Sequence, residues 1–334
     1  MEDYIYLIIG LMLLCIGFFD FFYTTLSASN SSFITSAVSK VIHKVILLTE
    51  KKFGRKVFAL SGLILNLSII LVWILIIWAG LYFVYTYDAE SILNSKGEIA
   101  TSSERLYFTG YVLSTLGNGD FFPVSTFTQL ISSSFSFFGF IFFTTAMTYL
   151  ISVYSAVINK RHLSLAIRNL GNSPEEVIRM LHSAQPSFIY TQINSLQEKI
   201  DLVNEHYQAF PLIHYYHNVE INTSFSLNIA KLDEALTIML SKSTSPHNRE
   251  MYFLKKSMDS LLNRFDEFHN IPHIKESTTQ LDWKYLGNII PQSGKELSEK
   301  PEIVYRRKIL TSMLLHEDLK WEHVYETGKL PSDE

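Results

Sequence analysis

Residues 115–120 form a short glycine-rich segment whose residue types could carry chemistry. Its glycines, Gly117 and Gly119, can adopt positive φ at little steric cost, so the segment can leave its main chain uncovered. Carbonyl oxygens exposed in this way can replace the hydration shell of a cation. Asn-Gly and Gly-Asp pairs are also common turn signals, and alone the six residues predict a turn more often than an ion site. The surrounding elements have to decide between the two interpretations.

The apolar stretch before this segment, residues 106–113, indicates how it is positioned. It is far too short to cross a bilayer, which takes about 20 residues. It lies between two spans of opposite direction, so it must start and end on the same side of the membrane. Such a helix is tolerated at membrane depth only where it is buried in protein or lines water. We therefore expect several copies of the chain to surround a cavity.

Three long runs are poor in charge: residues 4–26, interrupted only by Asp20, and the uncharged runs 57–87 and 121–159. Each is long enough to cross a hydrocarbon core about 30 Å thick. We therefore predict an all-α membrane protein with three transmembrane helices and one re-entrant helix. The first run follows an acidic start and lacks a cleavage signal, so we interpret it as a retained span.

The basic residues assign an orientation. Residues 31–56 carry six Lys and Arg against one Glu, whereas residues 88–105 carry four acids against Lys96 and Arg105. Because Lys and Arg are enriched in cytoplasmic loops, we expect the first connection inside and the second outside. The N-terminus is then outside and the C-terminal half is cytoplasmic. Asp20 lies in the cytoplasmic third of the first span, where we expect its carboxylate to snorkel to the interface.

The sequence of residues 115–120, T-L-G-N-G-D, resembles the selectivity filter of the potassium-channel pore-loop superfamily, whose usual form is T-V-G-Y-G-D. The helix before it ends in Ser114-Thr115, as family pore helices do, and Asp120-Phe-Phe-Pro123 matches the family's D-x-x-P exit. The resemblance covers residues 57–158, with a long span on each side of the loop. It implies a homotetrameric cation channel that conducts K⁺ and needs no cofactor besides the permeating ion.

In the family, successive carbonyls of the filter point at one axis. The resemblance assigns the filter to six residues: Thr115, Leu116, Gly117, Asn118, Gly119 and Asp120. It implies a hydroxyl at the inner end of the filter from Thr115, and a carboxylate behind its outer mouth from Asp120. Asn118 replaces the usual Tyr, Phe or Leu and cannot fill the same volume, although its amide could hydrogen-bond to a neighbouring Tyr or backbone group. A weakly selective monovalent cation channel is therefore the alternative to a potassium channel.

The third span supplies candidates for a gate. Gly139 lies 19 residues beyond Asp120, where the family places the hinge glycine of its inner helix. Phe143, Met147 and Ile151 follow at helical spacing and match residues that line the family's vestibule. A ring of such apolar side chains could close the pore by dewetting. The alternatives are that Gly139 is a close helix contact and that the other three are ordinary packing residues.

Residues 159–334 hold 43 of the 60 charged residues of the chain and read as helices. No G-x-G-x-x-G and no sustained period-2 alternation occur there, which argues against a Rossmann-type nucleotide domain and a β-roll cyclic-nucleotide domain. Apolar residues recur three and four apart, and a last helix is expected at about 301–321. We predict a cytoplasmic helical regulatory domain that binds an unknown ligand or protein.

Several functional classes lack support in the sequence. No basic arm or domain exists, so nucleic acid is not an expected partner, and the single Cys15 excludes a Cys-rich metal site. His206, His214 and His217 lie near one another in the chain, but no carboxylate or Cys completes a ligand set, so we expect aromatic packing or a peptide-binding surface rather than metal. No catalytic spacing rises above chance, so we expect no enzyme activity.

The chain thus divides into an N-terminal transmembrane helix (1–30), a basic linker (31–56), a pore module (57–158) and the regulatory domain (159–334). The linker suits a helix on the inner leaflet, attracted by anionic lipid. Its candidate lipid-binding residues are Lys40, Lys44, Lys51 and Lys52. A plain cytoplasmic connection is the alternative for the linker. For the whole protein, the alternative of another class is a non-conducting membrane receptor that signals through its helical domain.

Overall fold

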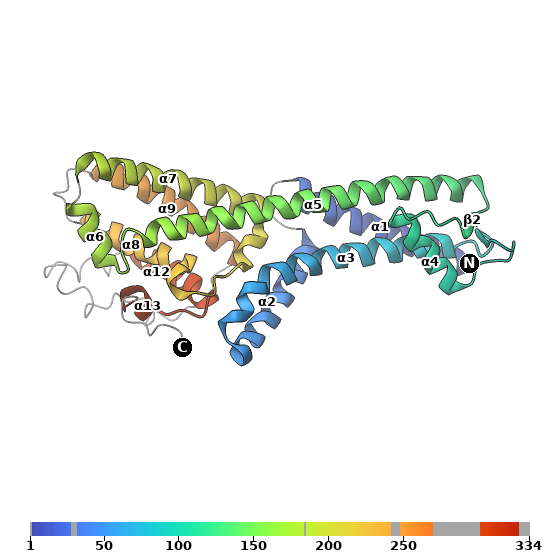
Figure 1. The fold of residues 1–334 in the computed structure, drawn as a ribbon, viewed down its shortest axis with the longest axis horizontal. Coiled ribbons are helices and arrows are strands. Elements are labelled where there is room, and N and C mark those ends of the chain that lie inside the picture. The colour runs from blue at the N-terminus through green and yellow to red at the C-terminus, as the bar shows by residue number, and fades with distance from the viewer. Residues whose placement is uncertain (1, 28–31, 184, 242–247, 270–300, 327–334) are drawn as a thin grey trace. The chain divides into compact units, whose positions relative to one another are not determined.

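The structure, a computed structural model, describes residues 2–27, 32–183, 185–241, 248–269 and 301–326. The first half contains α1 (Glu2–Leu26), α2 (Phe33–Phe53), α3 (Phe58–Thr86), α4 (Ser102–Leu113) and α5 (Thr126–Arg168) (Figure 1). Strands β1 (Ile92–Asn94) and β2 (Phe121–Pro123) form a small antiparallel sheet. The second half contains α6 (Pro174–Ser183), α7 (Pro186–Ala209), α8 (Phe225–Ser241), α9 (Asn248–His269), α12 (Pro301–His316) and α13 (Trp321–Glu326). Short 3₁₀ helices are η1 (Arg55–Val57), η2 (Pro211–Tyr215) and η3 (Ile221–Thr223).

Among the described residues, three helices are long and apolar enough to cross a membrane. They are Tyr4–Leu26 in α1, Leu60–Thr86 in α3 and Thr126–Arg168 in α5. This confirms the predicted all-α membrane fold. With 43 residues at 1.5 Å each, α5 is about 65 Å long, roughly twice the thickness of the hydrocarbon core. It therefore continues well beyond the membrane as one helix.

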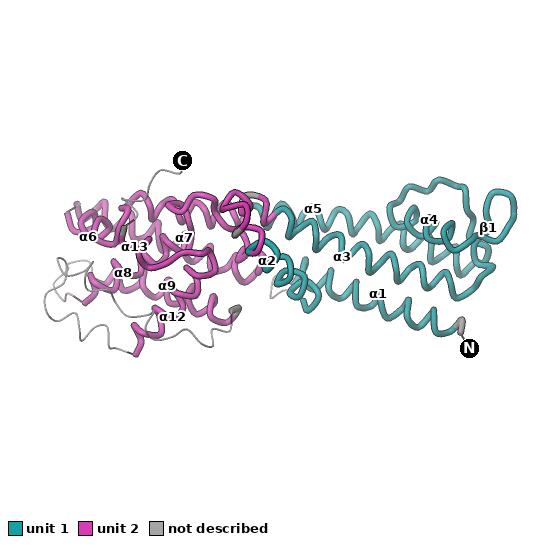
Figure 2. Tube along the Cα trace, turned by 90° about the horizontal axis from the view of Figure 1, so that it is seen from below, with its two compact units in different colours: residues 1–47, 63–154 teal, residues 48–62, 155–334 magenta. Residues whose placement is uncertain are grey.

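The chain forms two compact units (Figure 2). The first comprises residues 1–47 and 63–154, and the second comprises residues 48–62 and 155–334. The second unit therefore includes the start of α3 and the last part of α5 together with the C-terminal helices. The domain boundaries expected from the sequence mark membrane crossings, which this division does not test, and they remain predictions.

Aromatic side chains hold α1 against α5 in the first unit. The ring centroids of Phe18 and Phe138 lie 4.5 Å apart, and those of Phe21 and Phe142 lie 4.6 Å apart. Phe21 also meets Trp73 of α3 edge-on. Such pairs contribute about 0.5–1.5 kcal/mol each beyond the area that they bury. The N-terminal span is therefore a direct neighbour of the helix that follows the glycine-rich segment.

Asp20 is buried against protein, and its carboxylate is satisfied by protein donors. Its side chain is 1% exposed, and its carboxylate accepts hydrogen bonds from the Ile34 N–H at 2.9 Å and the Thr35 hydroxyl at 2.6 Å. The indole N–H of Trp73 donates to it at 2.7 Å. The expectation of snorkelling is therefore wrong. Because α2 begins at Phe33, Asp20 caps the N-terminus of α2 from a neighbouring helix, where free N–H groups favour an anion.

Helix α2 has its polar side buried and its apolar side exposed, the reverse of a helix on a soluble protein. Ser32, just before the helix, and Thr35 and Ser39 within it are buried. The exposed side carries apolar residues and lysines: Phe33, Ala37, Lys40, Val41, Lys44, Val45 and Leu48. Lys52 is exposed as well, whereas the side chain of Lys51 lies outside the described residues. An exposed apolar face with flanking lysines is typical of a helix at a lipid interface.

Helix α8 lies at the centre of the C-terminal helices, and nearly all of its side chains are buried. Its buried acids, Asp233 and Glu234, pair with Arg306 and Arg307 of α12. The Arg307 guanidinium also lies 3.9 Å from the centre of the Trp321 ring of α13. Buried charges are tolerated only with such partners. These pairs therefore fix α12 and α13 against α8.

The last helix expected from the sequence, residues 301–321, is two helices, so that expectation is wrong. Helix α12 ends at His316, and Asp318 has a φ of 54°. The N–H of Leu319 then donates to the carbonyl of Leu314 at 2.9 Å. A residue in the left-handed region ends an α-helix. Because that residue is Asp rather than Gly, no clear stop signal is visible in the sequence.

Candidate functional site

Helix α4 positions the glycine-rich segment, and a capping box fixes its first residue. The Thr101 N–H donates to the Glu104 carboxylate at 2.8 Å, and the Thr101 hydroxyl accepts from the Glu104 N–H. The hydrogen bonds from the Thr101 main chain and hydroxyl lower the pKa of the Glu104 carboxyl. Glu104 therefore satisfies free groups at the start of α4.

The buried side of α4 packs against α3 and the small sheet. Phe108 and Tyr111 share one apolar cluster with Leu81 and Tyr85 of α3 and with Ile92 of β1. The rings of Tyr85 and Phe108 meet edge-on with their centroids 5.2 Å apart. A short helix packed in this way against α3 and the small sheet holds its last turn, and the segment after it, in a fixed position.

Positive φ recurs at every second residue of the segment. The φ angle is 59° at Thr115, 57° at Gly117 and 80° at Gly119, whereas Leu116 and Asn118 between them have no such value. Alternation between left-handed residues and residues of negative φ turns successive peptide planes so that their carbonyls favour one side of the chain. Thr115 adopts this conformation at a steric cost of about 1–2 kcal/mol, because it carries a Cβ. Strain of this kind is concentrated at functional sites.

Tyr111 ties the segment to α4 and to β2. The N–H of Leu116 donates to the Tyr111 carbonyl at 2.9 Å, and the Tyr111 hydroxyl donates to the Phe121 carbonyl at 2.8 Å. Phe121 in turn pairs with Asn94 across the small sheet. Both ends of the segment are therefore attached to elements that pack on α3.

Asn118 lies in a chain of hydrogen bonds along the outside of the segment. Its amide donates to the Tyr107 hydroxyl at 3.1 Å and to the Asp120 carboxylate at 2.6 Å. This confirms the expectation that the Asn118 amide could bond to a neighbouring Tyr. A polar link thus occupies the place that the family usually fills with an aromatic or aliphatic side chain.

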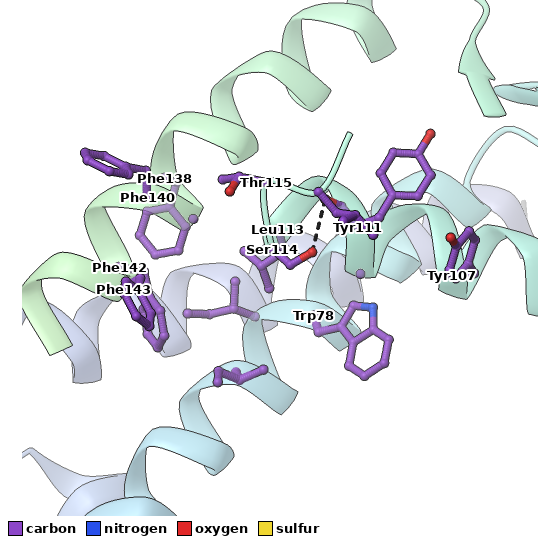
Figure 3. A pocket seen from close by; sticks show the side chains of 15 residues that line it. Trp78, Tyr107, Tyr111, Leu113, Ser114, Thr115, Phe138, Phe140, Phe142 and Phe143 are labelled. Carbon is purple, nitrogen blue, oxygen red and sulfur yellow. Dashed lines mark hydrogen bonds between the residues drawn. The ribbon is translucent and has the colours of Figure 1, made fainter. Parts of the chain in front are cut away.

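A cavity of about 710 Å³ lies beside the inner end of the segment, between α3, α4 and α5. Trp78 of α3 and Thr115 border it, together with four phenylalanines of α5 (Figure 3). Phe140 and Phe143 are more than 60% exposed in a single subunit. The lining is mostly apolar, so this wall suits lipid or protein better than a hydrophilic ligand.

Gly139 of α5 lies in close contact with the end of α4. A Cβ at this position would lie 1.9 Å from the carbonyl oxygen of Leu113 and 3.5 Å from Cγ2 of Thr115. Helix α5 runs through Gly139 without a break. The structure therefore places Gly139 at a close contact with the end of α4, and its role as a hinge remains a prediction.

The other residues expected to form the site share uncovered surfaces. Residues 115–120 are all exposed in the single chain. Phe143, Met147 and Ile151 are exposed by 65%, 44% and 68%. The structure brings Thr115 and Gly139 together, and Phe143 lines the same cavity as Thr115, whereas Met147 and Ile151 follow farther along α5.

Three aromatic residues that position the site were not assigned to it from the sequence. They are Trp78, Tyr107 and Tyr111. The Trp78 indole N–H lies 3.1 Å from both the Leu106 carbonyl and the Thr109 hydroxyl, which attaches α4 to α3. The spacing of Tyr107 and Tyr111, four apart on a short helix next to the segment, was the available signal.

Two long apolar helices, a short helix between them and a strained segment with alternating φ are the parts of a pore-forming membrane protein. The chain belongs to the two-helix ion-channel family, and the family model described as "Ion channel" matches residues 68–156. The chain is 32% identical over 270 residues to the uncharacterized membrane protein YdjJ of Bacillus subtilis (strain 168). The aligned region covers 79% of this chain and 78% of that protein. No solved structure matches the chain.

Proposed function

We propose that the protein is a tetrameric channel that conducts K⁺ through a filter formed by residues 115–120. The observation that carries the proposal is the positive φ at Thr115, Gly117 and Gly119. This alternation favours carbonyls on one side of the segment, and a ring of such carbonyls can take the place of the water that an ion sheds.

Several copies of the chain are needed, because one segment provides only part of an ion's coordination shell. The exposure of residues 115–120 and of Phe143, Met147 and Ile151 in one subunit supports this assembly. Both surfaces would be covered by neighbours or face the pore in a ring of four subunits. The fourfold symmetry comes from the family resemblance.

Potassium is the proposed ion because the segment is anchored on both sides. Asn118 holds the outer part of the segment through Tyr107 and Asp120, in place of the usual packing. Hydrogen bonds of this kind fix position but leave volume unfilled, so a weakly selective monovalent cation channel is the alternative.

Gating is proposed to come from the C-terminal helical domain, which we place in the cytoplasm with the N-terminus outside. Helix α5 leads from Gly139 past Phe143 and Ile151 into that domain without a break. A rotation or tilt imposed on its far end would therefore move the candidate gate residues. Their apolar side chains would close the pore by excluding water.

Purified protein in K⁺-loaded vesicles tests the proposal. Gly117→Ala and Gly119→Ala are expected to abolish K⁺ flux, because Ala strongly disfavours positive φ. Gly97→Ala is the matched control, since Gly97 also has positive φ and open space around it but lies in the loop after β1. Flux in all four proteins no greater than in protein-free vesicles would favour the non-conducting receptor, and equal flux above that level would refute the assignment of the filter to residues 115–120.

Reversal potentials with K⁺ on one side and Na⁺ on the other test the ion. Asn118→Tyr restores the usual family residue and is expected to raise the preference for K⁺. An unchanged ratio of permeabilities would show that position 118 does not set the width of the filter. A ratio near one in the wild type would establish the weakly selective alternative.

Anionic lipid is the proposed partner of α2, because its exposed side combines apolar residues with Lys40, Lys44 and Lys52. Lys51 is included from the sequence. Replacement of all four lysines by Gln is expected to weaken retention of added anionic lipid by the purified protein. Retention equal to that of the wild type would leave α2 as a plain connection.

A further inference from the structure

Residues 213–219, at the end of η2 and just after it, offer a row of main-chain carbonyls to two cationic side chains. Within the second unit, the Lys160 ammonium of α5 donates to the carbonyls of Ile213 at 3.0 Å and Tyr216 at 2.9 Å. The Arg55 guanidinium of η1 donates to the carbonyls of Asn218 at 3.2 Å and Val219 at 3.1 Å. Residues 213–219 are thus held by cations from two pore helices, one at the foot of α3 and one on α5.

Lys160 is well buried, with 4% of its surface exposed. Its ammonium lies 5.1 Å from the centre of the Phe225 ring and 5.8 Å from that of Tyr207. A buried ammonium is costly unless its hydrogen bonds are satisfied, and bonds from a charged donor are the stronger kind. If residues 213–219 moved away, this charge would lose the Ile213 and Tyr216 carbonyls as acceptors, so α5 and these residues are expected to move together.

The foot of α3 fits the same residues by shape. A Cβ at Gly62 would lie 2.0 Å from the ring of Tyr216, so the ring occupies the space that a larger residue would take. The Phe58 ring, which is 1% exposed, lies 5.0 Å from that of His217. Arg55 also donates to the carbonyl of Glu317 at 2.8 Å. The contact therefore combines charge-assisted hydrogen bonds with close packing.

We propose that residues 213–219 are the coupling segment through which the C-terminal helical domain controls the inner and outer pore helices, an inference that rests on the channel function proposed above. Arg55 immediately precedes α3, and Lys160 lies within the unbroken α5. A shift of the coupling segment therefore acts on both helices at once, through groups that are stiffly connected to the pore module along the chain.

Flux measurements on the full chain in vesicles test the coupling. Arg55→Met and Lys160→Met are each expected to change the rate of K⁺ flux in the same direction, by about fivefold or more, since allosteric couplings are typically of that size. The double variant should change the rate no more than the stronger single variant, because both cations act on one element. The ratio of K⁺ to Na⁺ permeability should stay unchanged. Lys255→Met is the control, because this lysine donates to the Thr237 hydroxyl at 2.9 Å, away from residues 213–219 in the chain.

A second pair of variants separates coupling from loss of folding. Gly62→Ala alone is expected to alter the rate of K⁺ flux, because its methyl group meets the Tyr216 ring. When Tyr216→Ala has already removed the ring, Gly62→Ala is expected to have no further effect. Each variant must elute and melt as the wild type does, and a variant that does not is replaced by the conservative Lys160→Arg or Arg55→Lys, which should retain part of the coupling.

Flux equal to that of the wild type in both Met variants, with Gly117→Ala still inactive, would overturn the coupling segment and leave the channel function intact. Additive effects of Gly62→Ala and Tyr216→Ala would overturn it as well. If the wild type shows no flux that depends on Gly117, the proposed function fails, and the coupling inference fails with it.

Discussion

The contact between Gly139 and the end of α4 gives the sharpest prediction for the pore. In Gly139→Ala, the new Cβ would lie 1.9 Å from the Leu113 carbonyl oxygen, against an ordinary contact of at least 3.4 Å. The two backbones must therefore separate by about 1.5 Å, because no flexible side chain end is there to move aside. Overpacking of this kind costs about 1–3 kcal/mol.

The displacement falls two residues before Thr115, where the candidate filter begins. Binding sites tolerate errors of only about 0.5 Å, so we expect the ratio of K⁺ to Na⁺ permeability to fall. A loss of about 1.4 kcal/mol in discrimination corresponds to about a tenfold change. Bi-ionic reversal potentials of the purified protein in vesicles measure this ratio directly.

The same experiment separates a contact from a hinge. If Gly139 acts as a hinge, Ala changes how often the channel opens and leaves the ratio of permeabilities as it was. Ser134→Ala, on an exposed part of the same helix, controls for a substitution by Ala in α5 that is away from the contact with Leu113. An unchanged ratio in Gly139→Ala, with altered open probability, would refute the positioning role assigned to the contact.

Two predictions concern stability. Asp20→Leu leaves the Ile34 N–H, the Thr35 hydroxyl and the Trp73 indole without their acceptor, and it is expected to destabilise the protein by about 2–4 kcal/mol. Asp20→Asn keeps an acceptor and should cost less. Equal melting temperatures for the two variants in detergent would contradict this prediction. Burial lowers the pKa of the Lys231 ammonium to about 8, with Arg168 adding to the shift and Glu176 opposing it. Because the unfolded chain then binds a proton that the folded chain lacks, the free energy of unfolding of the wild type should rise by roughly 2 kcal/mol between about pH 7.5 and pH 9.5 from this group. Lys231→Met should lose that gain. The same change of melting temperature with pH in both proteins would refute the assignment.

The candidate filter could be located from the sequence because its requirements are local. Positive φ at Gly117 and Gly119 follows from the residue type, and the polar link from Asn118 to Tyr107 follows from an amide placed beside aromatic residues. The positive φ of Thr115 had no such signal, because a Thr does not favour it.

Features that depend on how helices face one another could not be predicted in this way. Asp20 was expected at an interface because the sequence gives its depth along α1 but not the side on which it points. The hydrogen bonds of Arg55 and Lys160 end on main-chain carbonyls, which every residue carries, so no sequence pattern indicates them. The close approach at Gly139 was one of two interpretations, and only the three-dimensional contact with Leu113 distinguishes its steric role.

The buried carboxylate of Asp20 also bears on how the chain is made. The donors to its carboxylate, from Ile34, Thr35 and Trp73, all follow the first span in the chain, so that span alone offers Asp20 none of them. An unaccompanied Asp within a span opposes insertion, and the cost reaches about 2.5–3.5 kcal/mol only for a residue at the bilayer centre. The first span should therefore wait at the translocon until α3 has emerged, and both should enter the bilayer as a pair.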